Sequence, residues 1–355
     1  MDTSQSKKTA AEVLIERFLK DAEERGTMPW QRPYERYNAF NYFTKRPYRG
    51  FNRLMLPYGE YMTRNQITQY NKDKGYIKTD SRGHIVEATP DAYRFQKGIV
   101  WFPIVFFKVN SFKVSKEEVL AKFPDADVNK KSSTDVTYFG RADNGYVYIM
   151  KDGICYREKN ILRYYEVAER QHFRNARGEM LSSRIETGEV VIEKSDPKKV
   201  VYDYISRENI KLDDQYLGTP CYMPNMDKVC LNPHVKSEDA WFAIAFHELG
   251  HSTGAAHRLN REGVTLLSDD NNIYAKEECI AEICACLCCA ETGIINFETS
   301  GSAEYDNNIA YVQAWKKRVK GWGKDFIYIV SQADKAFNYI CNNPDSEADD
   351  EVGDD

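Results

Sequence analysis

The sequence has no apolar run that approaches the roughly 20 residues needed to cross a lipid bilayer. Its first twenty residues are polar with spaced apolar positions, a pattern typical of an amphipathic helix. They lack the unbroken apolar segment of a secretory signal. These absences argue against membrane-spanning and secreted proteins, so we expect a cytoplasmic protein without a membrane partner. The 355 residues give room for two domains of ordinary size.

Cysteine is too sparse for a disulfide scaffold, and its count of nine is odd. Four of the nine crowd into one short segment: Cys284, Cys286, Cys288 and Cys289. Cys284 and Cys288 lie one helical turn apart, so one possible interpretation of the segment is a metal site with thiolate ligands. Because free cysteine behaves as a small buried apolar residue, we interpret the segment as the core of a packed helix in a reducing compartment.

Periodicity and capping signals predict several helices and one long strand. A helix is expected at 9–24, and a strand at the β-branched and aromatic stretch 98–109. After a helix expected at VYDYISRENI (201–210), four more helices are expected in the C-terminal half, at 237–254, 274–291, 307–319 and 324–340. The first of these begins at Ser237, which can cap it, and the second ends just before Gly293.

Residues 247–251 form a His-Glu-x-x-His motif within the helix expected at 237–254. His247 and His251 are four residues apart, so both rings project from one face of that helix and can bind one Zn²⁺. Glu248 lies between them and can act as a general base towards an attacking water molecule. A catalytic zinc site needs one more protein ligand.

Three residues compete for the place of the third ligand. His257 has the spacing found in metzincins, but those enzymes also have a methionine turn downstream, and all eight methionines here precede residue 227. Glu278 and Glu282 lie four apart on the next expected helix. We therefore favour Glu278 as the ligand, with Glu282 orienting a ligand histidine, while the reverse roles stay open. Glu277, next to Glu278, is expected to point elsewhere.

The net charge of −5 is unevenly distributed. Residues 29–113 carry +9, with 15 lysines and arginines against 6 acids, and they are rich in aromatic residues. Cationic side chains follow a phosphate backbone and exposed rings stack on unpaired bases, so this segment favours single-stranded nucleic acid as a partner. A small domain also needs aromatic residues in its core, so a structural role for most of the rings stays open.

Several further motifs follow one another in a characteristic order. In the C-terminal half CYMPNMDKVCLN precedes FHELGHSTG, which is followed by RLNRE, YAKEECIAE and NNIAYVQAWKKRVKG. The N-terminal half contains GTMPWQRP, PYRGFNRLML, YMTRNQI, FQKGIVWFPIVFFK and RYYEVAERQ. Over about residues 11–172 and 201–341, the chain resembles the ArdC antirestriction proteins of plasmids and other mobile elements. It departs from their pattern at Ala255, where that family usually has histidine.

The resemblance implies an α+β fold with two domains. The first is a single-stranded-DNA-binding domain, and the second is a mostly helical, zincin-like metallopeptidase domain. The expected divisions are a flexible N-terminus (1–10), the DNA-binding domain (11–172) with an insertion (about 111–160), a linker (173–200), the metallopeptidase domain (201–341) and a disordered acidic tail (342–355). Within the N-terminal motifs, we expect these nucleic-acid contacts: Tyr48, Arg49, Asn52, Arg53, Thr63, Gln66 and Lys97.

The expected function is therefore that of an antirestriction protein in the bacterial cytoplasm. It would bind single-stranded DNA and carry one Zn²⁺ per chain at a peptidase site that acts on a protein substrate. One alternative is a DNA-binding protective protein whose metal site is structural or catalytically idle. Another is a regulatory protease that DNA only recruits. A structural site needs no carboxylate between its histidines, so Glu248 favours hydrolysis.

Overall fold

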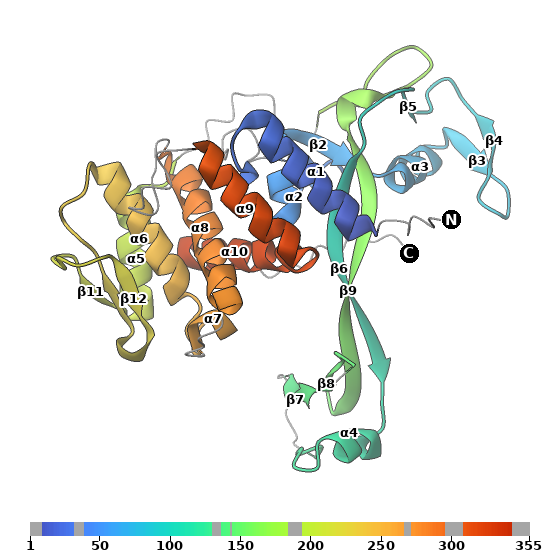
Figure 1. The fold of residues 1–355 in the computed structure, drawn as a ribbon. Helices are drawn as coiled ribbons and strands as arrows, with labels where there is room; N and C mark the ends of the chain where they lie inside the picture. Colours follow the sequence, from blue (N-terminus) through green and yellow to red (C-terminus); the bar gives the residue numbers. More distant parts are fainter. Residues whose placement is uncertain are drawn as a thin grey trace, which may run out of the picture. The chain divides into compact units, whose positions relative to one another are not determined.

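The computed structural model describes residues 9–31, 39–129, 136–142, 144–183, 194–265, 271–294 and 308–342. The fold is mixed α+β, as predicted (Figure 1). The helices are α1 (Ala10–Arg25), α2 (Gly50–Met55), α3 (Arg64–Asp73), α4 (Lys116–Lys122), α5 (Pro197–Glu208), α6 (Glu238–Ser252), α7 (Glu262–Thr265), α8 (Asn271–Thr292), α9 (Asn308–Trp322) and α10 (Asp325–Cys341). A 3₁₀ turn, η1 (Pro29–Gln31), follows α1.

The strands are mostly short, apart from two long ones. They are β1 (Ala39–Asn41), β2 (Gly59–Met62), β3 (Ile77–Thr79), β4 (Ile85–Ala88), β5 (Arg94–Phe95), β6 (Phe102–Lys113), β7 (Thr137–Arg141), β8 (Val147–Lys151), β9 (Ile154–Glu169), β10 (Phe173–Arg174), β11 (Lys211–Asp213), β12 (Cys221–Met223) and β13 (Lys228–Cys230). The long strand β6 overlaps the strand expected at 98–109, and the expected helices at 9–24, 237–254 and 274–291 correspond to α1, α6 and α8.

The described residues form two compact units. Unit 1 holds those of 1–104 and 166–347, and unit 2 holds those of 105–165. The expected division of the larger unit into a DNA-binding and a metallopeptidase domain stays a prediction. Residues 1–8, 184–193 and 343–355 lie outside the described residues, and with them most of the expected N-terminus, part of the linker and almost all of the acidic tail.

Unit 1 has an aromatic core that joins the N-terminal helices to the C-terminal ones. Phe18 of α1 lies 5.9 Å from Trp30 and 5.0 Å from Phe326 of α10, measured between ring centroids. Trp30 also meets Trp315 of α9 edge-on at 5.7 Å. All four rings are buried. Burying so much aromatic surface stabilises this junction, because aromatic side chains contribute the largest apolar areas to a core.

The cysteine-rich part of α8 is a packed core segment, as expected. Cys284, Cys286, Cys288 and Cys289 are fully buried, and all four are free thiols. Burial raises the pKa of three of these thiols, Cys286, Cys288 and Cys289, well above its usual value. Within the described residues these cysteines join no group that could hold a metal.

Unit 2 contains α4, β7 and β8 together with parts of β6 and β9. Strand β8 pairs antiparallel with both β7 and β9. Its apolar core gathers Val119 of α4 with Tyr148, Met150 and Cys155 of the strands. This unit coincides approximately with the expected insertion.

None of the described helices combines the length and the apolar character that a bilayer crossing requires.

Candidate metal centre

Helix α6 carries the His-Glu-x-x-His motif and is fixed at its start by a capping residue. The Ser237 hydroxyl accepts a hydrogen bond from the backbone N–H of Ala240 at 3.1 Å, as the sequence suggested. At Gly250 the helix crosses α8 so closely that a methyl group there would lie 3.2 Å from the Cα of Ala281. Helices α6 and α8 therefore lie side by side (Figure 1), which brings the histidines of one next to the glutamates of the other.

Three side chains from these two helices converge on one point. The Nε2 atoms of His247 and His251 lie 3.2 Å apart. The Glu278 carboxylate faces both rings, with Oε2 at 3.6 Å from His247 Nε2 and Oε1 at 3.4 Å from His251 Nε2. All three potential ligand atoms lie within 4.8 Å of one another, and in the described part of the chain no other such group occurs. Two imidazoles and one carboxylate form a donor set that suits Zn²⁺.

Each histidine also has a carboxylate of α8 beside its other nitrogen. Glu282 Oε2 lies 3.7 Å from Nδ1 of His247, near the position expected for an orienting acid. Glu277 Oε1 lies 3.3 Å from Nδ1 of His251. The expectation that Glu277 points elsewhere is therefore wrong. Adjacent residues on α8 are about 100° apart, and α6 crosses closely enough for Glu277 and Glu278 to reach different atoms of one ring.

These carboxylates determine the charge of the site. Burial alone would lower the pKa of His247, but Glu278 and Glu282 raise it to about 10. Burial likewise opposes protonation of His251, whereas Glu277 and Glu278 raise its pKa to about 9. Burial disfavours ionisation of Glu278 too, yet the two histidines hold its pKa well below the usual range. A cation that binds these groups therefore competes with protons for the histidine nitrogens.

Two further residues lie next to the ligand group. Glu248 is 8% exposed and follows His247 on α6. Tyr274 precedes Glu278 by one turn of α8 and is 61% exposed. Partial burial, a hydrogen bond with Glu278 and the negative charge of Glu248 raise the pKa of Tyr274 to about 12. Tyr274 was not predicted from the sequence, although its i, i+4 spacing from Glu278 was a usable signal.

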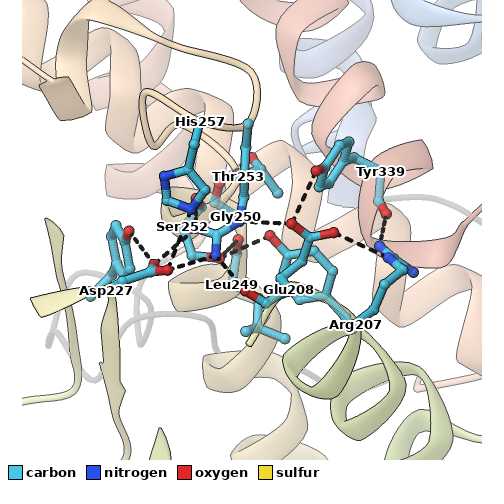
Figure 2. Close-up of polar contacts among 12 residues, drawn as sticks. Arg207, Glu208, Asp227, Leu249, Gly250, Ser252, Thr253, His257 and Tyr339 are labelled. Carbon is cyan, nitrogen blue, oxygen red and sulfur yellow. Dashed lines mark hydrogen bonds and ion pairs between the residues drawn. The ribbon is translucent and has the colours of Figure 1, made fainter. Parts of the chain in front are cut away.

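His257, the alternative third ligand, belongs to a different cluster. Its side chain is 60% exposed, and Nε2 lies 3.4 Å from Oδ2 of Asp227 (Figure 2). Asp227 in turn binds the buried guanidinium of Arg258 at 2.8 Å. Arg258 also donates to Glu208 at 3.0 Å, so this cluster joins α5, the turn before β13 and the segment after α6. His257 thus has an ion-pair partner outside the His-His-Glu group.

Comparisons with known proteins agree with this geometry. Residues 203–331, which include α6 and α8, match a family described as zincin-like metallopeptidases. The Mn(II)-bound crystal structure of the antirestriction protein ArdC from plasmid R388 is similar over 95% of this chain and 98% of that one, with 20% identity and a TM-score of 0.53. The chain has the fold of an ArdC antirestriction protein. The metal-free structure of the same protein is similar as well, with a TM-score of 0.52.

Two relatives are named DNA primase TraC, both from Escherichia coli. One is 31% identical over 121 residues, which is 34% of this chain and 8% of that protein. The other is 23% identical over 345 residues, or 94% of this chain and 27% of the relative. The chain therefore spans less than a third of either relative. Together with the crystal structures, these matches confirm the ArdC resemblance.

Within this ArdC-type fold, most of the expected nucleic-acid contacts have partners inside unit 1. Tyr48, Asn52 and Thr63 are buried. Arg53 is buried as well, and its Nη1 lies 2.9 Å from Oδ1 of Asp334 on α10. Their role in nucleic-acid binding stays a prediction. Packing inside unit 1 is sufficient to explain why each of these side chains is present.

The remaining expected contacts lie at helix starts and on the surface. Thr63 and Gln66 form a capping box at the start of α3, in which each side chain accepts a hydrogen bond from the backbone of the other. Arg49 is half-buried at the residue before α2. Lys97 is exposed. Lys97 is thus the one of the seven whose side chain is fully on the surface.

The structure also shows a cationic and aromatic surface around Arg64, which was not predicted from the sequence. The Arg64 guanidinium carbon lies 4.5 Å from the centre of the Phe95 ring and 4.2 Å from that of Trp101. Phe95 is 43% exposed. Arg94 and Lys97 flank Phe95, and no ion pair between these cations and an acid occurs among the described residues. The signal in the sequence was the acid-free segment 94–101, which holds two cations and two aromatic rings.

Proposed function

We propose that this chain is an antirestriction-type protein of the bacterial cytoplasm with two activities. A zinc site, one ion per chain, hydrolyses a peptide bond of a protein substrate, and the surface around Arg64 binds single-stranded DNA. The observation that carries the first activity is the position of Glu248, on the same helix as two histidines that converge with Glu278. This set combines a buried donor group with a nearby general base, which a purely structural site does not need.

Each residue of the site would have a separate role in hydrolysis. When bound, the zinc ion would supply a Lewis acid that polarises the scissile carbonyl and activates water. His247, His251 and Glu278 would hold it. Glu248 would accept the proton of the attacking water and pass it to the leaving amine. Tyr274, with a hydroxyl kept protonated by its raised pKa, would donate a hydrogen bond to the oxyanion.

The second activity is supported by the surface around Arg64. Guanidinium and ammonium groups without acidic partners attract phosphates, and an exposed ring such as Phe95 offers a base a stacking surface. The Arg64 guanidinium lies against two rings, so less side-chain entropy is lost when its N–H groups bind an anion. Protection of incoming DNA from restriction would follow from occupancy of the strand, as the ArdC resemblance implies.

The deciding experiment uses Glu248→Gln, with Glu238→Gln on the exposed start of α6 as the matched control. Zinc content, hydrolysis of a peptide library, single-strand binding and protection from restriction are measured for both. We expect Glu248→Gln to keep zinc and DNA binding and to lose hydrolysis, while Glu238→Gln retains all four. If the wild type holds zinc but cleaves no substrate, the alternative of a protective DNA-binding protein with an idle site is correct.

A further inference from the structure

Arg261 and Glu277 form a buried ion pair directly behind His251. Glu277 is 3% exposed and Arg261 6% exposed. The Arg261 guanidinium donates to both oxygens of the Glu277 carboxylate, from Nε at 2.9 Å and from Nη2 at 2.6 Å. One of these oxygens, Oε1, is the atom that lies 3.3 Å from Nδ1 of His251. The carboxylate thus connects a fixed guanidinium to the ring of a metal-ligand candidate.

Arg261 is itself fixed to the end of α6. Its Nη1 donates to the Thr253 hydroxyl at 2.7 Å, and its Nη2 donates to the backbone carbonyl of Gly250 at 2.8 Å. Both acceptors lie within three residues of His251. The segment after α6 therefore folds back onto the helix that carries the histidine, and it sets the distance between that helix and Glu277.

Two glycines make room for this pair. A methyl group at Gly254 would lie 2.9 Å from Nη2 of Arg261, and one at Gly263 would lie 2.7 Å from Cβ of Glu277. Real side chains essentially never approach so closely, so a larger residue at either position would force its neighbours to shift: Val264 or Arg261 at Gly254, and Glu277 at Gly263. The close packing leaves Glu277 little freedom to choose another orientation.

We propose that Glu277, held in place by Arg261, is the residue that orients His251 for metal binding. A carboxylate at Nδ1 fixes the ring so that Nε2 faces the ligand group, and such outer partners determine metal affinity. The inference rests on the proposed metal site. Glu282 is less well placed to orient the other histidine, His247. Its Oε2 atom lies 3.7 Å from Nδ1 of that ring, beyond hydrogen-bond distance.

The pair cannot be tested by a single neutralising substitution, because the remaining buried charge could unfold the protein. Two variants avoid this problem. Glu277→Asp keeps the charge and shortens the side chain, and the double variant Arg261→Met with Glu277→Gln removes both charges together. Glu282→Gln and the exposed neighbour Glu262→Gln are the controls. Each protein is measured for Zn²⁺ affinity against a competing chelator, for the rate of Zn²⁺ release, and for the absorption spectrum of the Co²⁺ form. The melting temperature of each metal-free protein reports on folding.

We expect about 10- to 100-fold weaker Zn²⁺ binding for Glu277→Asp and the double variant, with faster release and an altered Co²⁺ spectrum. Glu282→Gln should lose less, and Glu262→Gln nothing. Wild-type affinity in both variants that change Glu277 overturns the assignment. If the wild type itself binds no Zn²⁺, the proposed metal site is wrong and this inference is wrong with it. If the wild type binds Zn²⁺ and the Glu277 variants bind it equally well, only this inference is wrong.

Discussion

Arg53 and Asp334 form a buried ion pair between α2 and α10, with Nη1 and Oδ1 2.9 Å apart and side chains that are 10% and 8% exposed. The Arg53 guanidinium also lies over the ring of Phe337, 5.1 Å from its centre. The Arg53 side chain, which was expected from the sequence to contact DNA, thus contacts a C-terminal helix. This contact adds a polar link to the aromatic junction of Phe18 and Phe326 within unit 1.

The ion pair leads to a prediction about stability. Arg53→Met would leave the Asp334 carboxylate buried without its guanidinium partner, and we expect the free energy of unfolding to fall by about 3–5 kcal/mol. The double variant Arg53→Met with Asp334→Asn should recover much of that loss. Urea unfolding measures both values. If Arg53→Met unfolds at the same urea concentration as the wild type, the pair does not stabilise the junction.

The surface around Arg64 leads to a prediction about DNA. Phe95→Ala should weaken single-strand binding by about 1–3 kcal/mol, the range measured for base stacking on one aromatic ring. Arg64→Ala should also reduce the salt dependence of binding, by about 0.7 in the log–log slope for each phosphate that the variant no longer binds. Lys20→Ala, at an exposed position of α1, is the matched control for removal of a cation. Fluorescence anisotropy with a labelled oligonucleotide at several salt concentrations measures both effects. Wild-type binding by both Arg64→Ala and Phe95→Ala would place the DNA elsewhere.

The convergence of His247 and His251 could be predicted from the sequence because the pattern there is local. Residues four apart on a helix share a face, so the spacing of His247 and His251 was sufficient to pair them. The N-cap of α6 at Ser237 and the end of α8 before Gly293, which has φ 80°, were predictable for the same reason. Glu278 needed a long-range argument, which the absence of methionine after residue 226 and the family resemblance supplied.

Other features depend on contacts that no local pattern encodes. The orientation of Glu277 follows from the close crossing of α6 and α8 at Gly250, and the burial of Arg53 follows from a partner on α10. Charge counting along the sequence could not distinguish Arg53, which is paired inside unit 1, from Arg64, which is exposed. The same limit applies to the expected contacts Tyr48 and Asn52, since composition does not report burial.

Tyr274 leads to a prediction about catalysis. Tyr274→Phe removes the hydroxyl that would donate to the oxyanion but keeps the ring, so we expect kcat to fall by about 100-fold or more. Zinc content should stay unchanged, because the proposed ligands His247, His251 and Glu278 are untouched. Tyr328→Phe, an exposed tyrosine of α10, is the control. The rates are compared on whichever peptide the wild type cleaves. An unchanged kcat in Tyr274→Phe would assign the oxyanion to another group.

The cluster around Arg258 leads to a prediction about acid stability. Burial opposes the ionisation of Asp227, but hydrogen bonds from Arg258 and Tyr222 outweigh it and lower the pKa of this carboxyl. Glu208 behaves in the same way, with its pKa lowered mainly by Arg207 and Arg258 against the effect of burial. A carboxyl whose pKa is lower in the folded state contributes stability above its unfolded pKa, and this contribution is lost as the pH falls through the folded value.

Unfolding by urea between pH 7 and pH 3 measures this contribution. The stability of the wild type should decrease as the pH falls below about 4, the usual range of an unfolded aspartate. Asp227→Asn should be less stable than the wild type at pH 7 and should show a smaller decrease, because it lacks one of the carboxyls that take up a proton on unfolding. His257→Ala tests the exposed side of the cluster, and we expect it to unfold nearly as the wild type does, since its contact with Asp227 is screened by solvent. Equal pH dependence in Asp227→Asn and the wild type would show that the Arg258 ion pair does not contribute to acid sensitivity.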